Sequence, residues 1–309
     1  MERLKRFFLL ILCLLTLCAL FGFGTAAERS GEVCTLTVVY AGDGVPFEGL
    51  QIEIFRMGEL NDEGVYTLAG DFRKYPVEIS HVTTQAEWHT IADTLASYAL
   101  TDRLTPTATR LTDEKGEADF GELPFGMYLV LAEQYQNGET VYLFENFLVA
   151  LPGVDGEGNP QYHIRAIPKH DQYTPSPQEI PYKVIKEWKD GDGRDRPDFV
   201  TVEIFQDGTL QYTQKLSSEN NWSFAWTAPD DGAVWTVTEQ DVPHGYTVTM
   251  EKNGETFVVT NHRIPDESSD SSNPPVTGDT EVLWPYVLGL FFAGAVLAAV
   301  ALRGRRIEA

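Results

Sequence analysis

The sequence has little cysteine and little positive charge. Only three of its 309 residues are cysteine, and two of these, Cys13 and Cys18, lie in an apolar N-terminal run. If that run is a cleaved secretory signal, Cys34 alone remains and no intramolecular disulfide can form. The 23 arginines and lysines face 46 aspartates and glutamates, which gives a net charge of −23. So acidic a chain is a poor partner for nucleic acid or an anionic membrane surface.

Enzyme and metal motifs are also missing. The six histidines show no ligand spacing, and GxSxG, HExxH and P-loop patterns are absent. Asp190-Gly191-Asp192-Gly193 offers carboxylates but lacks the closing glutamate of a calcium loop, so we interpret it as a turn. The sequence therefore predicts a protein that is not an enzyme and needs neither metal nor cofactor.

Both ends carry targeting signals. Residues 1–27 combine three basic residues, an apolar run and small residues, which predicts a signal peptide. Residues 282–302 form an apolar stretch that as a helix would span roughly 30 Å, enough to cross a bilayer. Residues 303–309 carry three arginines and would form a basic cytoplasmic tail. The chain is thus expected to leave the cell through a transient membrane-anchored precursor.

Two linkers divide the exported part. Residues 171–180 are rich in proline, and residues 264–273 are rich in serine and aspartate. These linkers separate two predicted domains, at residues 32–170 and 181–263.

The second domain is predicted to be all-β. Short alternating runs separated by turn residues indicate seven strands in about 80 residues, which favours a β-sandwich. The runs cover residues 182–188, 198–205, 210–216, 222–226, 234–240, 245–250 and 255–261.

Three polar residues of this domain share strand faces with large apolar residues. Because side chains alternate along a strand, Lys186, Glu239 and Asn261 each align with apolar neighbours. Those neighbours are Val184, Trp188, Trp235, Val237, Phe257 and Val259. Burying such polar groups unpaired costs several kcal/mol each, so we expect the three to meet. Lys183 faces the opposite way and is the weaker lysine candidate.

Several segments of this domain form a family pattern. They are Val184-Ile185-Lys186-Glu187-Trp188, Arg196-Pro197, Val200-Thr201-Val202, Trp235-Thr236-Val237-Thr238-Glu239, Pro243, Gly245-Tyr246 and Val258-Val259-Thr260-Asn261. The pattern resembles the collagen-adhesin B-type (Cna B-type) repeat, and the spacing from Glu239 to Tyr246 is similar to the pilin E-box. The resemblance implies an immunoglobulin-like sandwich with a spontaneous isopeptide bond between Lys186 and Asn261, for which Glu239 shuttles protons. A hydrogen-bonded cluster without a covalent bond is the alternative.

The first domain mixes strands with a helix. Strands are predicted at residues 36–39, 50–55, 127–132, 142–151 and 162–167. Thr84-Gln85-Ala86-Glu87 is a capping box that opens a helix, whose apolar stripe we interpret as core packing. The stripe comprises Trp88, Ile91, Ala92, Leu95 and Tyr98.

The same domain resembles the N-terminal module of Gram-positive pilin-type surface proteins, a β-sandwich with an insertion. The resemblance rests on the pattern Gly116, Phe120, Leu123, Gly126 and Tyr128. Tyr40 stands about where a reactive lysine would sit, and the last strand offers no asparagine, so no isopeptide bond is expected here. Ile167-Pro168-Lys169 resembles the end of the pilin motif, although Pro160 and Ala166 replace its usual Trp and Val. Lys169 is therefore either the acceptor of a neighbouring subunit or a linker lysine.

A sorting motif lies between the second linker and the apolar stretch. Pro274-Pro275-Val276-Thr277-Gly278 resembles the LPXTG signal of Gram-positive cell-wall proteins, in which a sortase cuts between Thr and Gly. Pro274 stands where Leu is usual, which leaves the sortase class open. The resemblance implies joining of Thr277 to peptidoglycan or to a neighbouring pilin subunit, with Gly278 released. A plain single-pass anchor is the alternative.

The sequence as a whole thus predicts a cell-wall-anchored structural or adhesive surface protein, of the pilin-subunit type. The alternative is a membrane-held extracellular ligand-binding module that no sortase processes. No host or matrix ligand can be named from the sequence.

Overall fold

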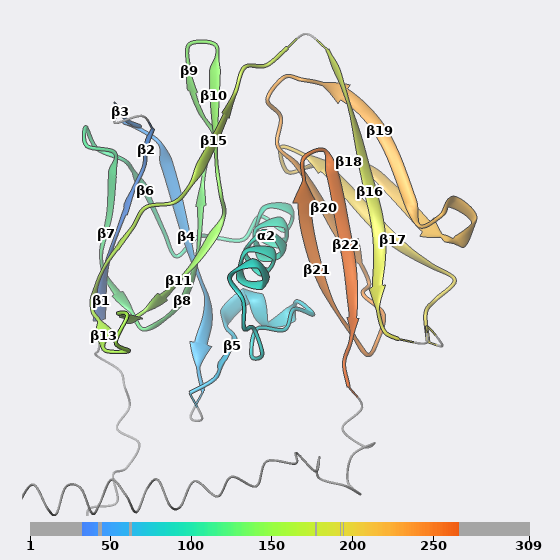
Figure 1. Cartoon of the computed structure of the whole chain (residues 1–309), viewed down its shortest axis with the longest axis horizontal. Coiled ribbons are helices and arrows are strands. Elements are labelled where there is room, and N and C mark those ends of the chain that lie inside the picture. Colours follow the sequence, from blue (N-terminus) through green and yellow to red (C-terminus); the bar gives the residue numbers. More distant parts are fainter. Residues whose placement is uncertain are drawn as a thin grey trace, which may run out of the picture. The chain divides into compact units, whose positions relative to one another are not determined.

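The computed structural model describes residues 33–265, except residues 43, 44, 62, 63, 177, 192 and 194. β-Strands dominate this range, which confirms the all-β prediction, and two sandwiches follow each other along the chain (Figure 1). The predicted signal peptide, sorting motif, apolar stretch and basic tail all lie outside the described residues. Within the described part of the chain, no helix is long and apolar enough to cross a membrane.

The first sandwich places a sheet of order β14-β1-β7 against one of order β11-β8-β4-β5, with β6 also paired to β4. A small sheet, β15-β10-β9, and the pairs β2-β3 and β12-β13 complete it. The strands are β1 (Val33–Val39), β2 (Ala41–Gly42), β3 (Val45–Pro46), β4 (Gln51–Leu60), β5 (Tyr66–Leu68), β6 (Ala108–Leu111), β7 (Glu117–Pro124), β8 (Gly126–Ala132), β9 (Tyr135–Asn137), β10 (Thr140–Phe144), β11 (Phe147–Leu151), β12 (Gly153–Val154), β13 (Pro160–Gln161), β14 (His163–Ala166) and β15 (His170–Tyr173).

Strands β4 and β8 are buried on both faces. Ile52 and Ile54 of β4 face the core inside the sandwich, whereas Phe55 and Met57 belong to a second core on the outer face. The change of face between Ile54 and Phe55 follows from the alternation of side chains along a strand. A sheet with apolar residues on both faces needs a second covering layer, and the helical insertion supplies it.

One predicted strand was wrong in its extent. Residues 142–151 were expected to form a single strand, but they divide between β10, which pairs with β15, and β11, which pairs with β8. Glu145 and Asn146 break the run, and the Asn146 side-chain amide donates a hydrogen bond to Asp93 at 3.0 Å. The break sends the two halves into different sheets.

The second sandwich contains seven strands, as the sequence predicted. They are β16 (Glu179–Lys189), β17 (Phe199–Gln206), β18 (Thr209–Ser217), β19 (Ser223–Pro229), β20 (Trp235–Gln240), β21 (Tyr246–Asn253) and β22 (Thr256–Arg263), with the 3-10 helix η2 (Ser218–Asn220) before β19. One sheet has the order β19-β16-β22-β21 and the other β18-β17-β20. The first and last strands, β16 and β22, are parallel neighbours. Strands β15 and β16 extend into the predicted linker from both sides and leave residues 174–178 between them.

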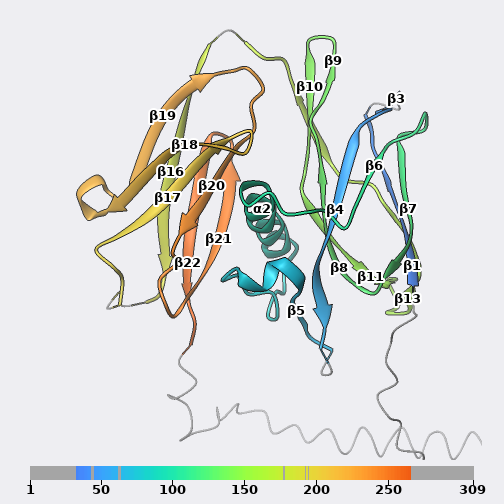
Figure 2. The same cartoon turned by 180° about the vertical axis from the view of Figure 1, so that it is seen from behind.

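The insertion consists of the 3-10 helix η1 (Gly70–Lys74) and α2 (Gln85–Thr101). The predicted capping box is present, because the Glu87 N–H donates to Thr84 Oγ1 and the Glu87 carboxylate accepts from the Thr84 N–H. Figures 1 and 2 show α2 between the two sandwiches, next to β21. Ile91 and Leu95 on its apolar stripe are buried in a core that includes residues of both sandwiches.

The same insertion covers the open edge of β21. The Met250 N–H donates to Thr94 Oγ1 at 2.7 Å, and the Val248 N–H donates to the Pro76 carbonyl at 2.8 Å. These N–H groups are spaced two residues apart and are not used by the pairing of β21 with β22. An edge strand that would otherwise be open to pairing with another chain is therefore covered.

Candidate functional site

The three predicted polar residues meet in the core of the second sandwich. Lys186 lies on β16 and Asn261 on the parallel neighbour β22, two residues beyond Val259, the register partner of Lys186. Glu239 comes from β20 in the facing sheet. Each is held on the inner face by the strand alternation that also buries Val184 and Val237.

The side chains of this triad are within reach of one another. Lys186 Nζ lies 3.6 Å from Glu239 Oε2, and Asn261 Nδ2 donates a hydrogen bond to Glu239 Oε1 at 2.9 Å. Lys186 Nζ also donates to the carbonyls of Glu187 and Val259, at 2.8 and 3.2 Å. Glu239 therefore bridges the amine and the amide, and the cluster joins both sheets.

Burial shifts the proton affinities of the amine and the carboxyl toward their neutral forms. Lys186 and Glu239 are each 4% exposed and Asn261 is fully buried. Loss of hydration lowers the pKa of Lys186 from 10.5 to about 8, with Glu239 opposing the shift. The same loss raises the pKa of Glu239 above its ordinary value, against the opposing influence of Lys186 and the Asn261 hydrogen bond. Both shifts are toward the neutral amine and the protonated carboxyl that an acyl transfer between Lys186 and Asn261 would need.

Two acceptor atoms of the triad are left without a hydrogen bond. Among the described residues, neither Glu239 Oε2 nor Asn261 Oδ1 has a hydrogen-bond partner, although both are buried. An unsatisfied buried acceptor is costly, and such atoms gather where chemistry takes place. A protonated Glu239 would be a hydrogen-bond donor, and Asn261 Oδ1 is an acceptor without a donor in the same cluster.

The alternative lysine is excluded by its position. Lys183 is exposed and points away from the core, as the strand alternation predicted. Only Lys186, of the two lysines considered, can reach the amide.

Aromatic rings enclose the amine. Lys186 Nζ lies 4.3 Å from the centroid of the Trp188 ring. Trp222 and Tyr246 contact that ring edge-on, with centroids 5.5 and 5.3 Å away. Trp222 has a φ of 54°, rare for a bulky residue, and its carbonyl accepts the Lys186 N–H at 2.8 Å. The sequence analysis missed Trp222, because nothing local indicates a left-handed backbone there.

The loop after β16 contributes an ion pair that the sequence analysis also missed. Asp190 accepts hydrogen bonds from Arg196 Nε and a terminal guanidinium nitrogen at 2.7 and 2.6 Å, and from the Tyr246 hydroxyl at 3.1 Å. Asp190, which the sequence indicated only as part of a turn, therefore forms an ion pair with Arg196. No group of three or more His, Cys, Asp or Glu among the described residues could hold a metal ion.

Lys169 lies on the exposed connection between β14 and β15. Its backbone carbonyl accepts a hydrogen bond from the Glu145 N–H at 3.2 Å, while its side chain faces solvent. The neighbouring Ile167 is 73% exposed. The position is accessible to another protein.

Tyr40, at the position where a reactive lysine would sit in the first sandwich, is buried. Its ring meets Phe144 edge-on at 4.8 Å, and burial raises the pKa of its hydroxyl. Gly116 of the pilin-like pattern has a φ of +74°, and a side chain there would collide with the Tyr40 carbonyl. The pattern therefore supports packing around Tyr40.

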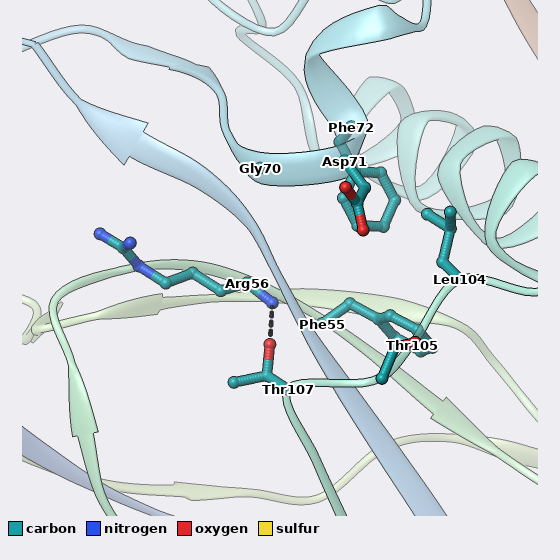
Figure 3. Close-up of a pocket in the computed structure, with 8 residues that line it drawn as sticks. All are labelled: Phe55, Arg56, Gly70, Asp71, Phe72, Leu104, Thr105 and Thr107. Carbon is teal, nitrogen blue, oxygen red and sulfur yellow. Dashed lines mark hydrogen bonds between the residues drawn. The ribbon is translucent and has the colours of Figure 1, made fainter.

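A shallow pocket of about 210 Å³ lies beside η1 in the first sandwich. Figure 3 shows Phe72, Leu104 and Thr105 gathered on one side, with the Arg56 side chain extending away from them. The Arg56 guanidinium donates two hydrogen bonds to the Phe125 carbonyl, at 2.9 and 3.1 Å. The lining combines apolar side chains with Arg56, Asp71, Thr105 and Thr107, and we assign no ligand to it.

Comparisons with known proteins find a family match in the second sandwich, which holds the triad. Residues 182–262 match the family model of the Cna protein B-type domain. The collagen adhesin of Staphylococcus aureus is 27% identical over 232 residues, which cover 62% of this chain and 19% of that protein. The chain thus spans about a fifth of the length of that relative.

The solved structures that match this chain include a single B repeat unit of the collagen binding surface protein of Staphylococcus aureus. It is 19% identical and covers 76% of this chain and 99% of its own, with a TM-score of 0.27. The major pilin SpaD of Corynebacterium diphtheriae is 16% identical and covers 75% and 66%, with a TM-score of 0.29.

The residues that match the Cna protein B-type family model, 182–262, coincide with the seven-stranded sandwich that holds the triad.

Proposed function

We propose that the chain is a structural subunit of a Gram-positive cell surface, of the pilin type, with a covalent bond between Lys186 and Asn261. The observation that carries the proposal is the buried triad. An amine, a carboxyl and an amide from three strands share one apolar core, with Glu239 between the other two. A core that needed only packing would fill this space with apolar residues at lower cost.

The bond would form by acyl transfer through a tetrahedral intermediate. Neutral Lys186 Nζ attacks Asn261 Cγ, and protonated Glu239 donates its proton to Asn261 Oδ1 as the C–N bond forms. A half-turn of the amide about its Cβ–Cγ bond brings Oδ1 to Glu239. Glu239, now a carboxylate, takes a proton from the attacking nitrogen and passes it to Nδ2. Nδ2 departs as ammonia while the carbonyl re-forms and the Oδ1 proton returns to Glu239. The product is a Lys-Asn amide, with no oxidant or reductant involved.

The fold supplies the proximity that this reaction needs. Parallel pairing of β16 with β22 fixes the amine and the amide on one face before any chemistry begins. Holding two reactants at near-attack distance can provide about 7–11 kcal/mol of the barrier. Each molecule reacts once, so the triad is not an enzyme active site.

The strand order gives the bond a mechanical use. The chain enters the domain on β16 and leaves it on β22, so a pull on the two ends loads these neighbouring strands in shear. A covalent link between them would carry the force past residues 187–260. A wall-anchored stalk needs this resistance.

Anchoring is proposed to run through the sorting motif. A sortase would cut between Thr277 and Gly278 and join Thr277 to peptidoglycan or to an amine of a neighbouring subunit. Lys169, exposed on the first sandwich, is the proposed acceptor amine for that neighbour. Collagen binding belongs to the named relatives, and no matrix ligand is proposed for this chain.

Cell fractionation tests the anchoring. The wild-type chain should be released by wall-degrading enzymes and not by detergent, whereas Thr277→Ala should stay in the membrane fraction or enter the medium. Wall-linked protein from the Thr277→Ala variant would refute attachment through Thr277. Release of the wild-type chain by detergent alone would favour the membrane-held module that no sortase processes.

A further inference from the structure

The Asp190–Arg196 ion pair closes the end of the site where β16 leaves the sandwich. The Asp190 side chain has no solvent exposure, and the Arg196 side chain that covers it is 36% exposed. Tyr246 of β21 donates its hydroxyl to the same Asp190 oxygen that Arg196 Nε contacts. We call the Asp190–Arg196 ion pair the clasp. Asp190 accepts three hydrogen bonds in it, two from Arg196 and one from Tyr246.

The turn before Arg196 is shaped around its guanidinium. Gly193 has a φ of +67°, and a Cβ there would lie 3.0 Å from both Cζ and Nε of Arg196. A side chain at this position would be strained by the positive φ and would crowd the guanidinium that contacts Asp190. Gly193 therefore leaves room for the guanidinium beside Asp190.

The clasp and the reactive amine share one aromatic ring. Arg196 Cζ lies 5.5 Å from the centroid of the Trp188 ring, over which Lys186 Nζ lies at 4.3 Å. Tyr246, bonded to Asp190, packs against the same ring. Two fixed charges of opposite sign thus lie beside the amine without touching it.

We propose that Asp190 and Arg196 are positioning residues for the Lys186–Asn261 bond, which hold Trp188 over the amine and adjust the charge that the amine carries while the bond forms. The inference rests on the proposed isopeptide bond and extends it to residues outside the triad. Neither residue contacts the reacting atoms.

The two charges act on the amine in opposite directions. Arg196 disfavours a second positive charge and lowers the pKa of Lys186, whereas Asp190 raises it. Arg196 in turn keeps the pKa of Asp190 below its ordinary value, and Asp190 raises that of Arg196. The pair therefore remains ionised while Lys186 titrates. Within the triad Glu239 also acts on the amine, and the other titratable groups around it are Tyr246, His262 and, from α2, Tyr98.

The test follows bond formation in the full mature chain. Protein taken from inclusion bodies into acidic guanidinium has not folded and should still have its full sequence mass. It is diluted into buffers between about pH 6 and pH 10, a range that brackets the titration of a buried lysine. Samples are quenched at intervals and weighed, while tryptophan fluorescence follows folding separately. The midpoint of the pH–rate profile is the readout.

Three variants separate charge from structure. Asp190→Asn should move the midpoint to lower pH and Arg196→Gln to higher pH, by about half a pH unit each, which is about threefold in rate below the midpoint. Arg196→Lys retains the charge and should keep the midpoint near that of the wild type, even if folding slows.

Midpoint shifts in the same direction for Asp190→Asn and Arg196→Gln, or equal slowing at every pH, would overturn the proposal. If the ion pair were only structural, losing either partner would have the same effect on the rate. If Asp190→Asn does not fold, the difference between Arg196→Gln and Arg196→Lys decides the matter alone. A wild-type chain that never loses ammonia would instead refute the bond itself, and the role of the clasp with it.

Discussion

Asn261 stands two residues beyond the register partner of Lys186 on the adjacent parallel strand, so the amide and the amine share one buried face. Glu239 reaches both from the opposite sheet. Because these contacts cross from the first strand of the domain to the last, a bond between them would constrain almost the whole domain.

Replacing Glu239 by Gln should leave the domain folded but without the bond, because Gln cannot give up and regain a proton. The variant should unfold at lower temperature than the wild type. A disulfide closing a loop of similar length contributes about 4 kcal/mol, and we expect a loss of that order. Thermal unfolding and intact mass should be measured together. Lys183→Ala, an exposed change on the same strand, is the control and should retain both the bond and the stability.

The free amine in Glu239→Gln should make stability rise with pH. Lys186 has a pKa of about 8 in the folded protein against 10.5 ordinarily, and removal of Glu239, which favours the charged amine, lowers the folded value further. The unfolded chain therefore binds the proton more tightly between these values, and folding gains free energy as pH rises to about 10.5. The gain should be on the order of 3 kcal/mol.

Denaturant unfolding at pH 7.5 and pH 10.5, with the double variant Glu239→Gln/Lys186→Met as reference, measures this dependence. The reference has no amine to titrate and cancels the contribution of the tyrosines. Equal pH dependence in the two proteins would mean that Lys186 is hydrated or already bonded.

Thr94→Val should weaken the cover over β21. The variant keeps the shape of the side chain but leaves the buried Met250 N–H without its acceptor, at a cost of about 1–3 kcal/mol. Thr90→Val, one turn earlier on α2, is the matched control, since Thr90 Oγ1 bonds only to the Ala86 carbonyl. Hydrogen exchange at the Met250 amide should accelerate in the first variant alone. Similar exchange in both would show that the contact is not needed to protect the edge.

Lys169→Ala should abolish polymers if Lys169 accepts the next subunit. Cells that express a pilin sortase should show an SDS-resistant ladder of the wild-type chain on blots. The variant should give a single band that is still attached to the wall, because Thr277 is unchanged. Lys115→Ala, at another exposed turn, should retain the ladder. A single wild-type band would return Lys169 to the role of a connecting residue.

Much of the site follows from strand alternation alone. The spacing around Lys186, Glu239 and Asn261 places each on an apolar face, and a shared core is the outcome that avoids unpaired buried charge. The clasp could not be foreseen, because the pairing of Asp190 with Arg196 depends on the path of a loop. The Gly-rich sequence of that loop indicates only that the chain turns.

The sequence pattern also does not predict that α2 covers the second sandwich. Thr236 and Thr238 occupy the face of β20 opposite the core and would ordinarily face solvent, yet they are 9% and 5% exposed. Helix α2, from far earlier in the chain, packs against β20 and β21. Its apolar stripe predicts that α2 is buried, but periodicity does not reveal which surface buries it.

Intact mass spectrometry of the folded ectodomain tests the central claim most directly. The wild-type chain should weigh less than its sequence by one ammonia molecule, and Lys186→Ala should have the full mass. The variant also controls for ring closure at Asn253-Gly254, which would release ammonia whether or not Lys186 is present. Fragmentation should place the link between the peptides that carry Lys186 and Asn261. A folded wild-type chain of full sequence mass would contradict the account.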